Sequence, residues 1–412
     1  MKINAPQFGD LKTFTVSINS HDITESVVQV SIFQDLLTPF PSCQIDVIDT
    51  VNMITKYNLA ANANVNIKLG TTQGHDTDSE KSLNFVIHDI GNKVQQNHKA
   101  FSYTILCAPR EFVNNQNAKV CKSFPQKRPD EIVKSVVQEF LHCTVKDVPP
   151  KPEQLKPHTE YIFDGQRNPS KADNQVTYIA PNVSPLTVVA NMCKIALMGG
   201  KADFVFFNKN GGNEYAFESL SNMWNRKPCV KFVQRPNNIK DNGDFKSNKN
   251  LEFQSLAADY FNSIMNLVSG YDANKTLTYD FIKKEFTPQE KSRNGANKIG
   301  EPDCTLKFLP KHTDMFQTGE GVFDKGSEWF SSRRNNLYNI EQNNVKIQLT
   351  GTPKAFEWLS EIAEIDIPNS DSLSDENLDE KYKGKYMIVA IGHIISRTSY
   401  FVNIELANGW SK

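Results

Sequence analysis

Residues 384–409, GKYMIVAIGHIISRTSYFVNIELANG, constrain the fold more than any other stretch, because they alternate with a period of two. From position 400 to position 407, a wholly apolar set of residues alternates with a set that is more polar as a whole, which is the pattern of a half-buried strand. Residues 386–395 are nearly all apolar, and the polar SRTS at 396–399 connects the two halves. The segment therefore predicts an antiparallel hairpin. The apolar face of its second strand comprises Tyr400, Val402, Ile404 and Leu406.

One histidine interrupts the first strand of this hairpin. A lone histidine on an apolar face is more often a packed, hydrogen-bonded residue than a catalyst, so we predict a structural role for His393. Its expected companions on that face are Met387, Val389, Ile391 and Ile395.

The composition describes a folded protein without a strong electrostatic preference for one kind of partner. The 412 residues are enough for two to four domains. The 46 basic and 47 acidic residues leave a net charge of −1, so no broad attraction toward nucleic acid or anionic lipid is expected.

The sequence shows no targeting segment and no cysteine motif. Residues 1–9 do not read as a signal peptide, and no stretch reaches the roughly 20 apolar residues of a membrane span. The protein is expected to stay in the cytosol unless another component carries it out. Seven cysteines without a C-x-x-C pair argue against a disulfide framework and a zinc site. We expect reduced, mostly buried thiols at Cys43, Cys107, Cys121, Cys143, Cys193, Cys229 and Cys304.

Strand-like segments dominate the first hundred residues. Turns that contain proline, glycine or asparagine separate them, which is typical of a closed or nearly closed antiparallel barrel. The segments cover residues 13–18, 27–35, 42–50, 64–70, 82–94 and 100–108.

The sequence pattern changes near residue 111. The segments 128–143 and 184–200 carry apolar residues at helical spacing, so each predicts an amphipathic helix. Residues 202–220 predict two strands around an Asn-Gly-Gly turn. The proline-rich stretch 148–180 predicts an extended segment that lies over a surface.

Strand-like segments return at residue 335, and they look like a repeat of the strands in the first hundred residues. VNIKLG at 65–70, followed by residues 84–108, has the same order and pattern as VKIQLTG at 345–351, followed by residues 386–408. His88 is then the approximate counterpart of His393. Two copies of one β-domain would play equivalent packing roles. Chance similarity between strands is the alternative.

These patterns predict a mainly β fold with an α+β middle region, in which two antiparallel β-barrel domains flank inserted α+β lobes. The first barrel is expected at 1–110, and an α+β domain with the proline-rich loop at 111–200. The second barrel is expected to combine 201–227 with 335–412. Residues 228–334 are expected to form an inserted middle lobe.

No motif predicts a catalytic, cofactor or metal site. The chain lacks G-x-x-x-x-G-K-[ST], H-E-x-x-H, G-x-S-x-G and C-x-x-C, and paired carboxylates for glycoside cleavage cannot be placed from sequence. An acidic segment is dense enough for calcium, but its spacing does not fit an EF-hand loop, so a solvated loop is favoured. Its carboxylates are Asp366, Asp371, Asp375, Glu376, Asp379 and Glu380.

Two adjacent arginines precede the returning strand texture. Arg333 and Arg334 have the chemistry to contact a phosphate backbone or the acidic residues of a neighbouring subunit. Solvated surface arginines are the more common case, so we expect both side chains in water.

Three longer segments, taken in order, resemble a known family. YIAPNVSPLTVVANMCKIALMGGKADFVFFNKNGGNEYAFESLSNM at 178–223 is similar to a helix and Phe-rich hairpin of that family. FNSIMNLVSGYDANKTLTYDFIKKEF at 261–286 is similar to its middle-domain segment, and residues 384–409 resemble its closing hairpin. The family is that of the baseplate hub proteins of contractile-tailed bacteriophages, related in fold to the base of type VI secretion spikes.

The resemblance implies a structural role in the virion. Each hub subunit carries two tube-type β-barrels, and a homotrimer presents six similar barrels as a pseudo-sixfold ring. The implied partners are the hexameric tail tube, the trimeric central spike, baseplate wedge proteins and, as a further candidate, the tape measure protein. DNA would pass through the channel without specific binding.

The resemblance also implies a protein that is not an enzyme and needs no cofactor. It would be made in the host cytoplasm and assembled into the tail baseplate. Two alternatives stay open from the sequence: a tail-associated cell-wall hydrolase and a tail protein that binds host glycans.

Overall fold

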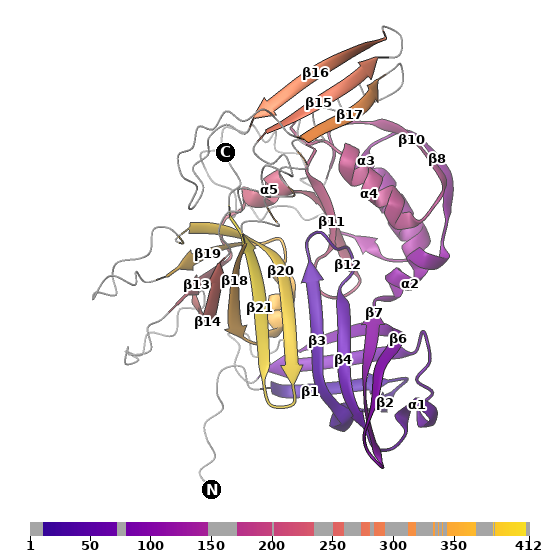
Figure 1. Cartoon of the computed structure of the whole chain (residues 1–412), viewed down its shortest axis with the longest axis vertical. Helices are drawn as coiled ribbons and strands as arrows, with labels where there is room; N and C mark the ends of the chain where they lie inside the picture. The colour runs from indigo at the N-terminus through magenta and orange to yellow at the C-terminus, as the bar shows by residue number, and fades with distance from the viewer. Residues whose placement is uncertain are drawn as a thin grey trace, which may run out of the picture.

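The structure of the protein is a computed structural model, and strands dominate it (Figure 1). The described residues are 11–71, 80–146, 171–199, 202–234, 250–258, 273–280, 284–292, 312–318, 333, 337, 340, 344–367, 382 and 384–408. The predicted mainly β fold with an α+β middle region is confirmed.

The first β-domain, drawn in indigo and purple in Figure 1, is an antiparallel sheet with the order β3-β4-β7-β6-β5-β1-β2. Its alternating sequence buries one face of each strand, including Val16, Ile32 and Ile45. The strands are β1 (Leu11–Ile18), β2 (His21–Asp22), β3 (Val27–Asp35), β4 (Ser42–Asp49), β5 (Asn64–Thr71), β6 (Lys81–Asn97) and β7 (Ala100–Ala108). Two short helical turns, η1 (Thr24–Ser26) and α1 (Met53–Lys56), lie in the connections.

The second β-domain is a closed ring of paired strands. β18 pairs with β21, β21 with β20 and β20 with β19. β19 then pairs with β13, β13 with β14, and β14 returns to β18. The strands are β13 (Val230–Val233), β14 (Asn250–Ala258), β18 (Asn344–Thr350), β19 (Ile362–Asp366), β20 (Gly384–Ser396) and β21 (Tyr400–Ala407). The predicted closing hairpin is β20 and β21.

One pair of strands joins the two β-domains. Residues 390–396 of β20 pair antiparallel with residues 29–35 of β3. The first half of β20, residues 384–387, pairs with β19 instead, so this strand closes the second ring and also reaches the first domain. Both domains therefore belong to one 13-stranded sheet (Figure 1).

The two domains match strand by strand, including their irregularities. β3, β4, β6 and β7 take the places that β14, β18, β20 and β21 take in the second domain. The β3–β4 ladder is interrupted at Val28, and the β14–β18 ladder at Gln254. The β6–β7 ladder is interrupted at His88, and the β20–β21 ladder at Val389. Bulges are specific features of a strand pair, so their coincidence aligns the copies residue by residue.

A further ladder tests this alignment independently. With the bulges superposed, the β4–β7 pair of Ile45 and Ile105 falls on the β18–β21 pair of Ile347 and Ile404. All four side chains are buried. The predicted duplication is confirmed by these shared registers, which chance similarity does not explain.

The alignment corrects one detail of the predicted repeat. Residues 65–70 lie in β5, which pairs with β6, whereas residues 345–350 lie in β18, which pairs with β21. β18 therefore corresponds to β4, and the counterpart of β5 is β19. The sequence misled here because the same alternation recurs in neighbouring strands and does not identify a strand's partner.

The middle unit packs helices against small sheets, and both predicted amphipathic helices are confirmed. α3 buries Ile132, Val133 and Val136, and α4 buries Val189 and Met192. The elements are α2 (Arg110–Asn117), β8 (Val120–Lys127), α3 (Pro129–Val136), η2 (Val137–Leu141), β9 (Thr144–Val145), β10 (Val176–Val183), α4 (Pro185–Ile195), β11 (Phe204–Asn208), β12 (Glu214–Ser219) and α5 (Leu220–Trp224).

The β11–β12 hairpin is buried on both faces. One face packs into the core of the middle unit through Phe204, Phe206, Tyr215 and Phe217. The other packs into the core shared by the β-domains through Val205, Phe207 and Ala216. A nearly continuous apolar run fits a strand that has no solvent face.

Strand pairing shifts two predicted boundaries. Residues 204–219, expected in the second barrel, pair with β9 of the middle unit. β13 and β14, expected in the inserted lobe at 228–334, complete the second ring instead. Long polar segments separate these strands in sequence from the other strands of their sheets. The local sequence pattern therefore assigned them to the wrong domain. The division into independently folding domains stays a prediction.

Part of the inserted region forms a separate three-stranded sheet. It comprises β15 (Ala273–Asp280), β16 (Glu285–Ser292) and β17 (His312–Thr318), with β15 in the centre. Several expectations lie outside the described residues: the proline-rich stretch up to residue 170, the carboxylates from 371 to 380, Cys304 and Arg334.

Ile404→Asp is expected to unfold the second β-domain. Ile404 is 0% exposed, so the substitution buries an unpaired carboxylate at a cost of roughly 3–5 kcal/mol. Glu405→Ala is the matched control, because Glu405 lies on the opposite face with Lys346 Nζ 3.1 Å from its carboxylate. Thermal unfolding followed by circular dichroism measures both. A folded Ile404→Asp beside an unfolded Glu405→Ala would mean that the strand faces are reversed.

Candidate functional site

His393 lies inside the second β-domain, where it is 0% exposed. Its ring stacks on Phe356 of η4 (Pro353–Glu357), with ring centroids 3.6 Å apart. Its Nδ1 lies 2.8 Å from the Tyr400 hydroxyl, which donates a hydrogen bond of 3.1 Å to the Thr352 carbonyl. Because that hydroxyl proton is directed to Thr352, Nδ1 is the donor to Tyr400. The predicted packed, hydrogen-bonded histidine is observed.

Burial keeps His393 neutral. Desolvation, together with the positive charge of Lys81, lowers the pKa of His393 to about 3. The ring has no contact with solvent through which to exchange a proton with a substrate. Gly351 completes the packing, because a Cβ there would come within 2.0 Å of the Tyr400 ring.

The bulge at Val389 changes which residues share a face with His393. Beyond it, Ile391 and Ile395 lie on the inward face with the histidine. Met387 precedes the bulge and lies on the opposite face, so the predicted grouping with Met387 and Val389 is wrong. One extra residue inverts the alternation, and the sequence hides this because both faces are apolar.

The bulges also identify the true counterparts in the first domain. His88 matches Val389, and its side chain is exposed. The position that matches His393 falls in a further irregularity, at Asn92 and Lys93. The predicted equivalence of His88 and His393 is therefore wrong by several residues.

A cluster of charges is buried between the middle unit and the second β-domain. Glu218 of β12 is 0% exposed, and it accepts hydrogen bonds from Arg226 and, at 3.0 Å, from Asn222. Arg226 Nη1 also lies 3.5 Å from Glu361 Oε1. Lys209 Nζ lies 2.7 Å from the same oxygen.

These carboxylates hold two parts of the chain together. Burial raises the pKa of Glu218, although the charges of Arg226 and Lys209 oppose this effect. Burial also disfavours the charged form of Arg226, but Glu218 and Glu361 outweigh it and raise the pKa of the guanidinium. Glycoside cleavage needs two carboxylates on either side of an open cleft. Glu218 is enclosed, so the cluster has a structural role.

The other candidate side chains also have structural partners. Arg333, expected at the surface, donates from Nη1 to the carbonyls of Cys193 at 2.8 Å and Phe204 at 2.7 Å. Asp366 of the acidic segment forms an ion pair with Lys231. Within the described residues, no three His, Cys, Asp or Glu side chains are grouped to hold a metal ion.

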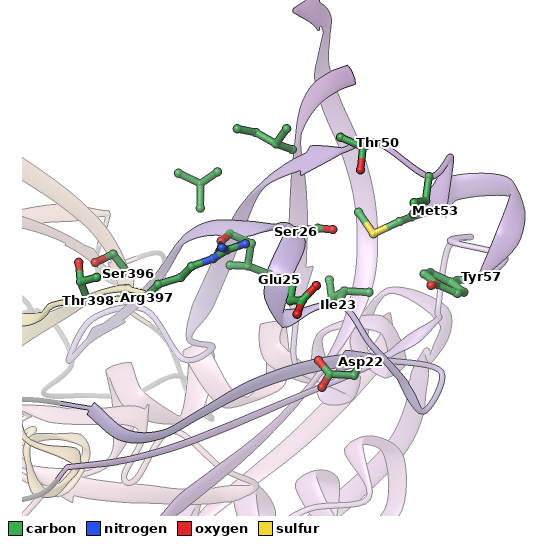
Figure 2. A pocket seen from close by; sticks show the side chains of 14 residues that line it. Asp22, Ile23, Glu25, Ser26, Thr50, Met53, Tyr57, Ser396, Arg397 and Thr398 are labelled. Atoms are coloured by element: carbon green, nitrogen blue, oxygen red, sulfur yellow. Dashed lines mark hydrogen bonds between the residues drawn. The ribbon is translucent and has the colours of Figure 1, made fainter. Parts of the chain in front are cut away.

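An open groove at the end of the first β-domain is a candidate interaction surface. Its volume is about 800 Å³, and its walls come from η1, α1, the end of β4 and the β20–β21 turn (Figure 2). Three exposed apolar side chains line it: Val28 at 47%, Ile48 at 44% and Val51 at 49% exposure. Sequence reasoning missed this groove. The sequence feature that could have revealed the groove is the adjacent pair of Val27 and Val28. A strand with one buried face needs an apolar side chain at only one of two consecutive positions.

Charged side chains lie around the groove. In Figure 2, Arg397 in the β20–β21 turn lies across from Met53 and Tyr57, while Asp22 and Glu25 lie between these sides. Arg397 Nε donates a hydrogen bond of 3.1 Å to the Val27 carbonyl, which fixes the turn against the start of β3. The groove thus spans the joint between the two β-domains.

Arg226→Met is expected to lower the free energy of unfolding by about 3–5 kcal/mol, because it leaves Glu218 buried without its cation. Adding Glu218→Gln should recover part of the loss, since the uncompensated charge is removed. Urea unfolding of both variants measures this. A double variant no more stable than Arg226→Met would show that lost packing, and not charge, is responsible.

His393→Gln is expected to reduce the pH dependence of stability. The folded pKa of about 3 lies below the unfolded value of about 6.5, so the unfolded chain binds a proton that the folded chain excludes. Wild-type stability should therefore fall by about 2 kcal/mol from pH 7 to pH 5 through this residue, and the variant should lack that contribution. Urea unfolding at both pH values tests this. Equal losses of stability in both proteins would mean that His393 has the same pKa in the folded and the unfolded chain.

Comparisons with other proteins agree with this architecture. No protein-family model and no curated protein sequence matches the chain. Among solved structures, the 43 kDa tail protein of prophage MuSo2 from Shewanella oneidensis aligns with a TM-score of 0.58 and 7% identity, covering 96% of this chain and 98% of that protein. The tail protein from Neisseria meningitidis MC58 aligns with a TM-score of 0.58 and 8% identity, covering 96% of each chain.

The described helices include none that is both long and apolar enough to cross a membrane.

The matches extend over nearly the whole length of both chains, so they include the two β-domains and the middle unit together. The chain therefore shares the fold of these tail proteins, as its resemblance to baseplate hub proteins predicts.

Proposed function

We propose that the protein is the structural hub of a contractile phage tail baseplate. Three chains form a pseudo-sixfold ring that joins the hexameric tail tube to the trimeric central spike. The fold shared with tail proteins supports a role in the tail. The two register-matched β-domains within one chain support the ring.

The joint between the β-domains is the observation that carries this proposal. Within the chain, β20 of the second domain pairs with β3 of the first. In the matched domains, the counterpart of β20 is β6 and the counterpart of β3 is β14. A second copy that uses the same joint pairs its β14 with β6 of the first copy. Three such steps close a ring of six similar domains.

Both counterpart edges are available in the described part of the chain. β5 pairs with β6 only at positions 81–86, and beyond Ile87 the described residues pair only β7 with β6. β13 pairs with β14 only as far as Glu252, so the described strands leave that edge of β14 unpaired from Phe253 onward. Val94 on β6 is 54% exposed. Unpaired edges with exposed apolar residues favour pairing with another chain.

The register of the joint indicates which residues meet. Within the chain, Ile394 lies opposite Ser31. In the bulge-corrected alignment Val94 matches Ile394, and Ala257 matches Ser31. Val94 of one chain therefore lies opposite Ala257 of the next chain in the proposed ring.

The proposed role also defines the remaining partners and the location. The tail tube stacks on one side of the ring and the spike on the other, and wedge proteins and the tape measure protein contact the same assembly. DNA passes through the channel without specific binding, which suits a chain with a net charge of −1. The protein is made in the host cytoplasm, acts in the virion baseplate and catalyses no reaction.

The purified protein is expected to be a trimer. Light scattering should give a mass three times the 46.6 kDa of one chain, because each chain supplies two of the six domains of the ring. Dilution should dissociate it to monomers without unfolding, since the joint within each chain persists. A monomer at every concentration up to that of assembly would contradict the proposal.

Val94→Cys combined with Ala257→Cys is expected to cross-link neighbouring chains. With the exposed Cys121 and Cys229 changed to serine, mild oxidation should give covalent dimers and trimers on a denaturing, non-reducing gel. The matched control is Ser31→Cys with Ile394→Cys, which should form a bond within one chain and leave its mass unchanged. Val94→Cys alone should give no trimer. Native trimers without the paired cross-link would show that the ring closes through another surface.

A further inference from the structure

Two cysteines of the first β-domain lie directly opposite one another. Cys43 of β4 and Cys107 of β7 are register partners in an antiparallel ladder. Both are free thiols, 2% and 1% exposed. Directly opposed residues have Cβ atoms about 4.5–5.5 Å apart, and a disulfide needs about 3.5–4.5 Å. A small adjustment of two adjacent strands brings the sulfur atoms within bonding distance.

The two thiols also interact with each other. Burial raises the pKa of the Cys43 thiol well above its usual value, and its hydrogen bond and electrostatic interaction with Cys107 act in the same direction. The two sulfur atoms therefore share one inward-facing site in the core.

The duplicated domain shows what this pair replaces. The counterparts of Cys43 and Cys107 are Val345 and Leu406, which are also register partners and also buried. An apolar pair fills this position in the second domain, so packing alone does not require two thiols in the first.

We propose that Cys43 and Cys107 are an oxidation site, at which a cross-strand disulfide forms when the protein meets a peroxide. One thiolate attacks a peroxide oxygen, which gives a sulfenic acid and releases hydroxide. The second thiolate attacks the sulfenic sulfur and expels a second hydroxide. With the two thiol protons, these leave as water, so two thiols and one hydrogen peroxide give one disulfide and two water molecules.

A second groove lies beside this pair on the outer face of the sheet, whereas the two thiols face inward. Its volume is about 380 Å³, and both Cys43 and Cys107 belong to its lining. Exposed Phe33 and exposed His88 lie in the same lining. Since the thiolate is the reacting form, buried thiols react slowly at neutral pH and faster as the pH rises.

The bond links β4 to β7 and encloses β5 and β6 in the closed loop. A disulfide that closes a loop of this length stabilises the fold mainly by restricting the unfolded chain. The formation of the bond does not depend on the proposed function, but its use does. A tail protein is made in a reducing cytoplasm and then released, so the disulfide would form after release, in the domain that carries one side of the joint.

The test uses the full-length protein with Cys121→Ser, Cys229→Ser and Cys304→Ser, so that neither the exposed thiols of the described residues nor Cys304 interferes. It is incubated with hydrogen peroxide at pH 7 and pH 9, treated with catalase, denatured, alkylated and digested. Mass spectrometry should find a peptide that links Cys43 to Cys107, forming faster at pH 9. The oxidised protein should melt at least about 5 °C above the same sample treated with dithiothreitol.

Cys43→Val with Cys107→Leu is the control variant, because it copies the pair of the second domain. It should fold, and peroxide should leave its melting temperature unchanged. Cys143→Ser should keep the response. Cys43 and Cys107 that are both alkylated, or each oxidised to a sulfinic acid without a linked peptide, would overturn the proposal. Light scattering of the reduced protein reports the trimer separately, so either proposal can fail alone.

Discussion

The antiparallel pairing of β3 with β20 is the constraint on which the rest of the structure depends. It comprises seven residue pairs, and the Leu36 amide continues it by donating a hydrogen bond of 2.8 Å to the Val389 carbonyl. β20 also closes the second ring, so its register is fixed from inside that domain. A slip by one residue would turn His393 outward and every apolar neighbour with it. The interior of one domain therefore sets the geometry of the joint between both.

The middle unit secures this joint through the β11–β12 hairpin. A Cβ at Gly211 in its turn would meet the Phe356 ring at 2.8 Å and Leu83 at 3.2 Å, so the turn packs against both β-domains and requires glycine. Phe356 in turn stacks on His393, which connects the hairpin turn to the core beside β20. The buried pair of Glu218 and Arg226 orients the base of the same hairpin. Apolar contact supplies most of the attachment, and the charges, which tolerate few geometries, restrict its orientation.

The sequence predicted the elements that follow from local alternation of apolar and polar residues. It missed the features that depend on which strands pair with each other. The closing hairpin, the helices α3 and α4 and the buried face of Ile404 follow from periodicity, because burial of one face imposes it. The bulge at Val389 does not, since an extra residue in a strand that is apolar on both faces leaves no mark in the pattern. The placement of β13 and β14 in the second ring, and the partners of Arg333, depend on contacts between distant segments. The groove beside Val28 left only one local mark, the adjacent Val27 and Val28, because most of its lining comes from segments far apart in the sequence.

Duplication within one chain makes the two kinds of joint unequal. The joint between β3 and β20 forms at the high effective concentration of one molecule, whereas its proposed counterpart between β6 and β14 must form between molecules. Before assembly the free β6 edge is a hazard, because unpaired strands invite aggregation. Lys93, Gln95 and Gln96 flank Val94 on that edge with polar, exposed side chains, which disfavours indiscriminate pairing. In the proposed ring, such a joint would be weak by itself and would benefit from assembly on the proposed threefold spike. The ring proposed for this chain would therefore open between subunits and never within one.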